Sequence, residues 1–493
     1  MKKGRMAVIL VLLASIMVLL AYVLSVVLEG GPIFEQPTTS TATTTVTTET
    51  TEDLEARRAA EREALEKHIR ENTVYVDAGI RVFNDRELSK EIFITDRKMS
   101  FYSLGLEDGH YEVKRSYDDA ETFGFIPEAS VKKSLKEFIA APEEDCEYDY
   151  IRTIPDFPEN PRIKARALYL SISTTTGSGF DHILDVVENT ELNSLVIDIK
   201  DDSEELLFES DAAAKYNPEA NRHARLKKAQ LAPIIKKAKD KGIYLIARIV
   251  TFKSPIYSEQ NRDGIITYAG TDTPFTEDGV LLWTSPMDRN LWEYNIGLGE
   301  EAADLGFNEI QYDYVRFPTV PLTKEFYYKD LGTHSKTYAI QSFLRYAGER
   351  LHAKKVYLAA DIFGWAATAV DDVQIGQHWE AMTNVVDYMC PMIYPSHYGE
   401  WNFGIQYPDT QPYETVLAAT QDCIDRNGNV TNPAILRPWI QHFTASYIYY
   451  QGLQYIEYGR EEIKAQIRAL KEKGIEEYLL WNPSNDYEID VLK

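Results

Sequence analysis

The sequence predicts an α/β protein whose main domain is a (β/α)8 TIM barrel, preceded by a small β-rich module and an N-terminal transmembrane helix. Eight apolar, strand-like runs recur within residues 164–493. Helical patterns separate these runs, which is typical of a parallel sheet covered on both faces. A barrel of this kind typically needs about 250 residues, so this region also leaves room for insertions.

The N-terminal residues predict a membrane anchor. Lys2, Lys3 and Arg5 precede an uncharged apolar run over residues 6–28, which is long enough for the roughly 20 residues of a bilayer-spanning helix. A cleavable signal peptide is the alternative, but no clear small-x-small cleavage site follows the run. We favour an uncleaved, single-pass anchor over residues 1–30. Its basic tip would lie inside the cell and the rest of the chain on the extracytoplasmic side of the cell membrane.

Linkers are predicted on both sides of the β-rich module. Residues 37–51 are almost all Thr and have too little apolar surface to fold. Residues 52–71 have the charged, Ala-rich pattern of a solvated helix, so we assign residues 31–73 to linker and helix. Pro155, Pro158 and Pro161 mark a second linker, which we assign to residues 141–163.

Residues 74–140 predict a small antiparallel β module. Short alternating runs occupy residues 91–94, 98–102 and 109–114, and turn residues separate them. Residues 123–131 resemble the closing strand of bacterial SH3-like domains. A generic β-rich spacer is the alternative interpretation of the same pattern.

Composition excludes some classes of function. The chain has 52 Lys and Arg against 77 Asp and Glu, a net charge of −25, which argues against nucleic acid as a partner because its backbone needs a cationic face. The three cysteines, Cys146, Cys390 and Cys423, are widely spaced and odd in number. They predict neither a metal site nor a disulfide framework, although a single disulfide bridge outside the cell is an alternative that the sequence leaves open. The sequence indicates no oligomeric state.

The elements of the barrel can be placed in order along the chain. The eight predicted strands are residues 166–172, 194–200, 243–250, 306–318, 356–363, 385–394, 436–441 and 477–482. Clear helical patterns cover residues 226–241, 290–305, 335–352 and 460–473, and Gly306 suits a helix C-cap. An open doubly wound sheet is the rival fold, but residues 173–179 lack the glycine spacing of a dinucleotide-binding loop.

Polar residues gather at the ends of these predicted strands, where barrel enzymes place their active sites. The side chains we expect there are Asp198, Lys200, Asp201, Arg248, Asp313, Arg316, Asp361, Tyr394, His397, Arg437, Trp439, Gln441, Trp481 and Asn482. The set is rich in carboxylates, aromatic rings and hydrogen-bonding groups, and it has no basic cluster for phosphate. We therefore expect a carbohydrate substrate.

Two carboxylates on adjacent strands suit glycoside cleavage, which needs one on each side of the scissile bond. Asp313 lies in an apolar strand, where a charged residue is seldom buried unless it is paired or used. Arg248 and Arg316 would keep it ionised, so we assign it as nucleophile. Asp361 has apolar neighbours that would hold it protonated, so we assign it as general acid/base. A structural ion pair between Asp313 and either arginine is the alternative.

Several of these segments together resemble the DUF4015 family of glycoside hydrolase-like barrels. The D-Y-V-R-F-P ending of residues 306–318 is similar to the fourth-strand motif of that family. Further segments fit its pattern: Ser194–Asp201, Arg248–Phe252, Leu358–Trp365, Asp387–Pro395 and Arg437–Gln441. The resemblance covers most of residues 164–490. It implies a barrel glycosidase whose fourth-strand and fifth-strand carboxylates are Asp313 and Asp361.

The remaining strand-end residues are predicted substrate contacts: Asp198, Arg248, Arg316, Tyr394, His397, Arg437, Trp439, Gln441, Trp481 and Asn482. We expect no cofactor and no metal, because His378, His397 and His442 are isolated and no H-x-H occurs at a strand end. The sequence thus predicts a membrane-anchored, extracytoplasmic glycoside hydrolase acting on a poly- or oligosaccharide. The alternatives are a non-catalytic carbohydrate-binding or cell-wall protein on a degenerate barrel, and a metal-dependent deacetylase or amidohydrolase.

Overall fold

The computed structural model of the chain describes residues 68, 71–77, 79–95, 99–115, 117, 119–133, 138, 145–148, 150, 154–321 and 323–492. The predicted anchor and the Thr-rich linker lie outside these residues. Among the residues described, no helix has both the length and the apolarity that crossing a bilayer requires.

The predicted β module is an antiparallel sheet of six strands in the order β1-β4-β5-β6-β2-β3. Alternate residues of these strands face a small apolar core that includes Val82, Phe101, Val113 and Ile126. The predicted strands are confirmed as elements, and the likeness to SH3 domains stays a prediction. Their bounds are β1 Thr73–Val76, β2 Arg81–Phe83, β3 Glu91–Ile94, β4 Met99–Glu107, β5 His110–Lys114 and β6 Gly124–Pro127.

The main domain is a closed parallel barrel with eight strand positions, as the sequence predicts. Its strands follow one another in chain order, β17 pairs with β7 to close the ring, and β15 and β16 share the seventh position. The strands are β7 Arg166–Leu170, β8 Ser194–Lys200, β9 Tyr244–Val250, β11 Glu309–Asp313, β13 Tyr357–Phe363, β14 Tyr388–Met392, β15 Ile435–Leu436, β16 Trp439–Gln441 and β17 Tyr478–Trp481.

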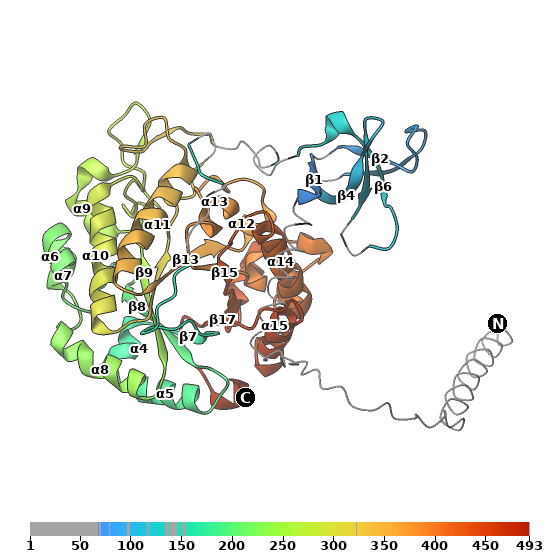
Figure 1. Cartoon of the computed structure of the whole chain (residues 1–493). Helices are drawn as coiled ribbons and strands as arrows, with labels where there is room; N and C mark the ends of the chain where they lie inside the picture. The colour runs from blue at the N-terminus through green and yellow to red at the C-terminus, as the bar shows by residue number, and fades with distance from the viewer. Residues whose placement is uncertain are drawn as a thin grey trace, which may run out of the picture. The chain divides into compact units, whose positions relative to one another are not determined.

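Helices cover the outside of the barrel (Figure 1). The four predicted helices are confirmed as α8 Lys228–Asp240, α10 Arg289–Leu305, α11 Lys336–Ala353 and α15 Arg460–Glu472. Gly306 ends α10 with a φ of 104°, the left-handed conformation expected of its C-cap. The other helices are α4 Ile172–Thr176, α5 Phe180–Glu188, α6 Asp211–Tyr216, α7 Pro218–Arg222, α9 Pro255–Gln260, α12 Trp365–Thr368, α13 Trp379–Thr383, α14 Pro412–Asn427 and α16 Ile489–Leu492. A short ribbon of β10 Thr267–Tyr268 and β12 Phe326–Tyr327 lies in the loops.

The barrel interior is filled by a separate cluster of buried side chains, many of them aromatic. Tyr244, Tyr357, Tyr388 and Trp439 are among its members. Phe157, from the segment that precedes the first strand, also belongs to this cluster, and Asn160 donates to the backbone oxygens of Asn308 and Lys355. This packing closes the amino-terminal end of the barrel and leaves the carboxyl-terminal end for a site.

Candidate active site

Strand register brings five polar side chains together at the carboxyl-terminal end of the barrel. Asp198 of β8 is opposite Arg248 of β9, which is in turn opposite Gln311 of β11. Gln311 is also opposite Ala359 of β13. Because strand side chains alternate between faces, Asp313 and Asp361 lie two residues further along on the same inward face. The site therefore has two layers. Asp198, Arg248 and Gln311 form the lower layer, and Asp313 and Asp361 form the upper one.

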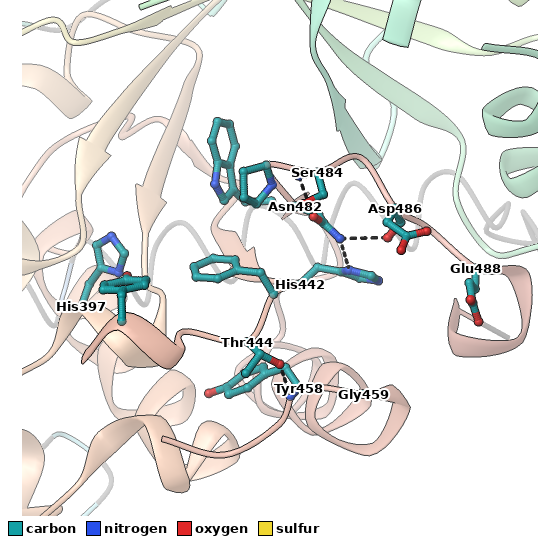
Figure 2. A pocket seen from close by; sticks show the side chains of 13 residues that line it. His397, His442, Thr444, Tyr458, Gly459, Asn482, Ser484, Asp486 and Glu488 are labelled. Carbon is teal, nitrogen blue, oxygen red and sulfur yellow. Dashed lines mark hydrogen bonds between the residues drawn. The ribbon is translucent and has the colours of Figure 1, made fainter. Parts of the chain in front are cut away.

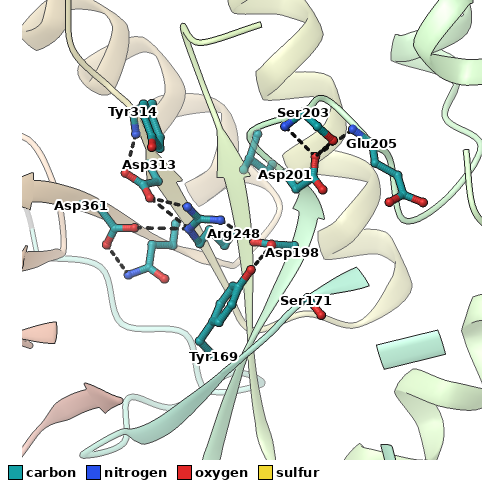
Figure 3. A network of polar contacts seen from close by, with 12 residues as sticks. Tyr169, Ser171, Asp198, Asp201, Ser203, Glu205, Arg248, Asp313, Tyr314 and Asp361 are labelled. Atoms are coloured by element: carbon teal, nitrogen blue, oxygen red, sulfur yellow. Dashed lines mark hydrogen bonds and ion pairs between the residues drawn. The ribbon is translucent and has the colours of Figure 1, made fainter. Parts of the chain in front are cut away.

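Arg248 is the centre of this arrangement (Figure 3). Its Nε and Nη2 donate to Oδ2 of Asp313 at 3.1 and 2.5 Å, and its Nη1 donates to Oδ1 of Asp198 at 2.6 Å. The Nε is also 3.9 Å from Oδ2 of Asp361. The charges of Asp198 and Asp313 chiefly raise the pKa of Arg248 against the effect of burial, so it stays cationic.

Asp361 is 1 % exposed and has two different carboxyl oxygens. Its Oδ1 accepts from Nε2 of Gln311 and from Nε1 of Trp439, each at 2.7 Å. Its Oδ2 has no hydrogen-bond partner among the described residues. Burial, and then the charge of Asp313, raise the pKa of Asp361 well above its usual range. Since Oδ1 already receives two N–H donors, the proton of the neutral acid belongs on Oδ2.

Asp313 is 7 % exposed and faces open space rather than the packed interior. In addition to its two bonds from Arg248, its Oδ1 accepts from the backbone N–H of Tyr314 at 2.6 Å. Tyr314 has a φ of 48°, a left-handed conformation that is costly for a bulky side chain. Strain of this kind persists only where the surroundings enforce it, and it concentrates at functional sites.

A cavity of about 320 Å³ opens above the two carboxylates, and we call it the central cavity. Asp313 is the single carboxylate among the described residues that line it, whereas Asp361 lies just beneath its wall. Aromatic rings make up much of its surface, which suits a ligand with both apolar faces and polar edges. Its lining is Arg248, Asp313, Tyr314, Arg316, Phe363, Met392, Tyr394, His397, Trp439 and Trp481.

Comparison of the sequence with known families decides what kind of domain this is. The family model of DUF4015, described as "Putative glycosyl hydrolase domain", matches residues 167–487. The chain belongs to the DUF4015 family. This confirms the resemblance inferred from the strand motifs, and the match spans all eight strand positions of the barrel. No curated protein matches the sequence.

Solved structures of several proteins are similar to this DUF4015 chain. A hypothetical protein from Ruminiclostridium thermocellum is 30% identical over 39% of this chain and 96% of its own, with a TM-score of 0.34. The PgaB (BpsB) glycoside hydrolase domain from Bordetella bronchiseptica is 11% identical over 67% and 99%, with a TM-score of 0.47. An α-galactosidase from Thermus thermophilus is 12% identical over 80% and 71%, with a TM-score of 0.38.

The DUF4015 barrel brings most of the predicted site residues to the central cavity. Arg316 lies there among aromatic rings, 4.7 Å from the ring centre of Trp283 and 4.8 Å from that of Phe363. Burial lowers its pKa. The partner of Asp313 is thus Arg248, and Arg316 is held by rings and by the backbone oxygen of Phe317, to which its Nη1 donates.

Four predicted contacts lie outside the central cavity. Arg437 is 0 % exposed and pairs with Glu309 at the first residue of β11, far below the strand ends. Gln441 is buried and donates to Oδ1 of Asp409. Asp198 is buried and accepts from the hydroxyl of Tyr169 at 2.6 Å. Asn482 lines a neighbouring cavity.

Two residues of the site were missed by the sequence reasoning. Tyr169 holds Asp198 and Gln311 holds Asp361. Both stand at inward positions of strands that were otherwise predicted correctly, and a polar amide within the run Glu309–Asp313 was the available signal for Gln311.

By contrast, Asp201 accepts from the backbone N–H groups of Ser203 and Glu205 and so stabilises a turn.

The part of the chain that the structure describes contains no cluster of three or more His, Cys, Asp or Glu residues arranged to hold a metal ion.

Proposed function

We propose that the barrel is a glycoside hydrolase that cleaves a poly- or oligosaccharide with Asp313 and Asp361. One observation carries the proposal: two carboxyl groups, Asp313 on the cavity wall and Asp361 buried with a raised pKa, share one arginine beneath an aromatic-lined cavity. Pairs of carboxyl groups held in different protonation states are what glycosidases use. The family assignment supports the same class of activity.

The contacts suggest a role for each carboxyl group. Asp313 lines the cavity and accepts two N–H groups of a buried guanidinium and one backbone N–H, which fix the direction of its carboxyl group. We assign it as the nucleophile that attacks the anomeric carbon. Asp361 would give its Oδ2 proton to the leaving oxygen and recover a proton from the attacking water in the second step.

The spacing of the two groups favours retention of the anomeric configuration. Their Oδ2 atoms lie 3.1 and 3.9 Å from the same nitrogen, Nε of Arg248, so they cannot be farther apart than the sum of these distances. That bound, about 7 Å, accommodates the roughly 5–5.5 Å separation of retaining enzymes and excludes most of the 6.5–9.5 Å range of inverting ones.

The test is to change each carboxyl group separately to the amide in the full chain. Asp313→Asn and Asp361→Asn should each lower kcat by roughly 100-fold or more on a substrate found by glycan screening. Asp240→Asn, at the exposed end of α8, is the matched control and should leave kcat unchanged. Added azide should restore turnover in each variant, with opposite anomers of the glycosyl azide as products. Full activity in both amide variants would refute the assignment.

A non-catalytic carbohydrate-binding protein is the second candidate, and one observation favours it. Asp313 is locked to Arg248 by two hydrogen bonds, which is the arrangement expected of a structural ion pair. Binding of a glycan by the unmodified protein without any product, measured by calorimetry and chromatography of the same mixture, would establish this alternative.

The location of the protein is a separate proposal that rests on the sequence. Residues 6–28 are long and apolar enough for an anchor, and basic residues precede them. The barrel would then act on glycans on the extracytoplasmic side of the membrane. Fractionation of cells that express the full chain or a variant without residues 1–30 tests this, since only the full chain should sediment with membranes.

A further inference from the structure

A second, larger cavity adjoins the central cavity, and we call it the outer cavity (Figure 2). Its volume is about 700 Å³, and the loops that follow β16 and β17 form most of its wall. His397 and Trp481 line both cavities, so the two are neighbours across these side chains. The remaining lining is His442, Phe443, Thr444, Tyr447, Tyr458, Gly459, Asn482, Pro483, Ser484, Asp486 and Glu488.

Hydrogen bonds hold both loops in place. Asn482 donates to the backbone oxygen of Asp486 at 2.8 Å and accepts from the backbone N–H of Ser484 at 2.9 Å. On the other side, the hydroxyl of Thr444 accepts from the backbone N–H of Tyr458 at 3.0 Å. The shape of the outer cavity is therefore set before a ligand arrives, which reduces the ordering cost of binding.

The lining chemistry restricts the ligand. It consists of hydroxyl and amide groups, aromatic rings and two carboxylates, Asp486 and Glu488, and none of the described lining residues is Lys or Arg. Hydroxyls, amides and rings suit the hydroxyl edges and apolar faces of a sugar. The carboxylates would repel a ligand that carries carboxylate, sulfate or phosphate groups.

One buried donor on this wall lacks an acceptor. His442 is 8 % exposed, and burial lowers its pKa to about 4, so its ring is neutral at neutral pH. Its Nδ1 is 3.2 Å from the amide nitrogen of Asn482, which is a donor. The Nδ1 must accept, and the ring proton is therefore on Nε2, which has no partner within the described structure. A buried N–H without an acceptor is unfavourable. The atom is shielded from solvent, so a ligand oxygen would accept from it only after the ring turns toward the outer cavity.

We propose that the outer cavity is a second sugar-binding site, and that the ligand is a chain of at least two sugar units free of acidic groups. The chain would cross Trp481 and His397, with one unit in each cavity. Cleavage of that chain between the cavities rests on the proposed function of Asp313 and Asp361. Binding in the outer cavity does not.

Tyr447 and Tyr450 allow a matched test. Both are on the short helix η6, Ser446–Gln451, but Tyr447 lines the outer cavity and Tyr450, at 90 % exposure, does not. The full-chain Asp313→Asn variant is applied to an array of neutral and uronic acid-containing oligosaccharides of one to six units, alone and combined with Tyr447→Ala or Tyr450→Ala. We expect affinity for neutral oligosaccharides to rise from one unit to three. Tyr447→Ala should weaken binding by roughly 3- to 10-fold, and Tyr450→Ala by less than about twofold.

Each outcome of this experiment decides the proposal. Affinity that does not depend on chain length, a preference for uronic acid-containing oligosaccharides, equal losses in the two tyrosine variants, or no binding to any member of the array would overturn it. Length-dependent binding together with no cleavage by the unmodified protein would keep the second site and reject the hydrolase. Cleavage of a polymer with the same KM in the unmodified protein and its Tyr447→Ala variant would keep the hydrolase and reject the second site.

Discussion

Two buried arginine–carboxylate clusters lie inside the ring of described strands, one at each end, and they differ in what they leave open. At the amino-terminal end Arg437 donates to both oxygens of Glu309 at 2.6 and 2.8 Å and to Glu477 at 2.8 Å. At the other end Arg248 joins Asp198, Asp313 and Asp361, where one oxygen of Asp361 has no hydrogen-bond partner in the described structure.

This comparison separates structural from chemical use of the same residue types. Every carboxylate of the lower cluster is bonded to its arginine, and Arg437 and Glu309 are sealed from solvent. The upper cluster holds a carboxylate in contact with a cavity and a protonated acid beside it. Nη2 of Arg437 also lacks a hydrogen-bond partner in the described structure, but Arg437 reaches no solvent. A buried cluster sealed from every cavity holds a fold together, whereas a cluster at a cavity can exchange a proton with a ligand.

Removing each arginine in turn tests most directly whether the two clusters differ in function, and it should have the largest effect. Arg437→Met and Arg248→Met should both lower the free energy of unfolding by about 3–5 kcal/mol, because each leaves buried carboxylates unpaired. Denaturant unfolding measures this loss. The protein that remains folded should keep its kcat in Arg437→Met and lose it in Arg248→Met. Equal loss of kcat per folded molecule in the two variants would show that the two ends do not differ in function.

The second prediction concerns pH. Burial raises the pKa of Asp198 from its ordinary value of 3.8 to about 6, and burial together with the charge of Asp313 raises that of Asp361 well above its ordinary value. A carboxyl group whose pKa is raised by folding binds its proton more tightly in the folded state. The free energy of unfolding should therefore decrease as pH rises from about 4 through 6 and above.

Denaturant titrations between pH 4 and pH 8 measure this slope. Asp361→Asn and Asp198→Asn should each make the decrease shallower, since the amide does not titrate. Glu380, which Arg426 holds at a pKa of about 2 despite its burial, gives the opposite sign, with stability that is lost only as pH falls below about 4. An unchanged slope in both amide variants would contradict the assigned protonation states.

Most of the fold, and the two central carboxylates, could be predicted from the sequence because both follow local rules. The eight strands and four helices were found from apolar periodicity, and Asp313 and Asp361 from charges that end buried strands. Arg437 and Gln441 were misplaced for a definite reason. A strand period of two puts residues 437, 439 and 441 on one face but does not tell how far along the barrel axis each residue lies. Only the tertiary structure shows that Arg437 reaches Glu309.

The surroundings of Arg316 could not be predicted for a different reason. The left-handed φ of Tyr314 changes the direction of the chain directly after Asp313, and a tyrosine gives no sequence signal for that conformation. Arg316 is consequently carried to the rings of Trp283 and Phe363. Sequence reasoning found the cations near Asp313 but could not choose between them, because the choice depends on a backbone conformation set by tertiary contacts.

A smaller effect is expected where a residue acts through Arg248. Asp198→Asn keeps one oxygen for Nη1 of Arg248 but removes the charge that helps to orient the guanidinium. We expect kcat to fall by roughly 10-fold with KM nearly unchanged, because Asp198 lies in the layer below Asp313 and Asp361 and its two oxygens are already bonded to Arg248 and Tyr169. Steady-state kinetics separate the two parameters. A rise in KM with constant kcat would instead indicate direct substrate binding, as first predicted for this residue.

The smallest expected effect tests the outermost bond of the upper cluster. Tyr169→Phe removes only the hydroxyl that donates to Oδ2 of Asp198 at 2.6 Å, and a hydrogen bond to a charged group contributes about 1.5–3 kcal/mol. Much of that loss should appear in stability and little in kcat, since two bonds from Arg248 still hold Asp313. Tyr244→Phe, which removes the corresponding hydroxyl from Glu309 in the lower cluster, is the matched control. If Tyr169→Phe lowers kcat far more than Tyr244→Phe at equal cost in stability, Tyr169 also helps to orient Arg248, through its bond to Asp198.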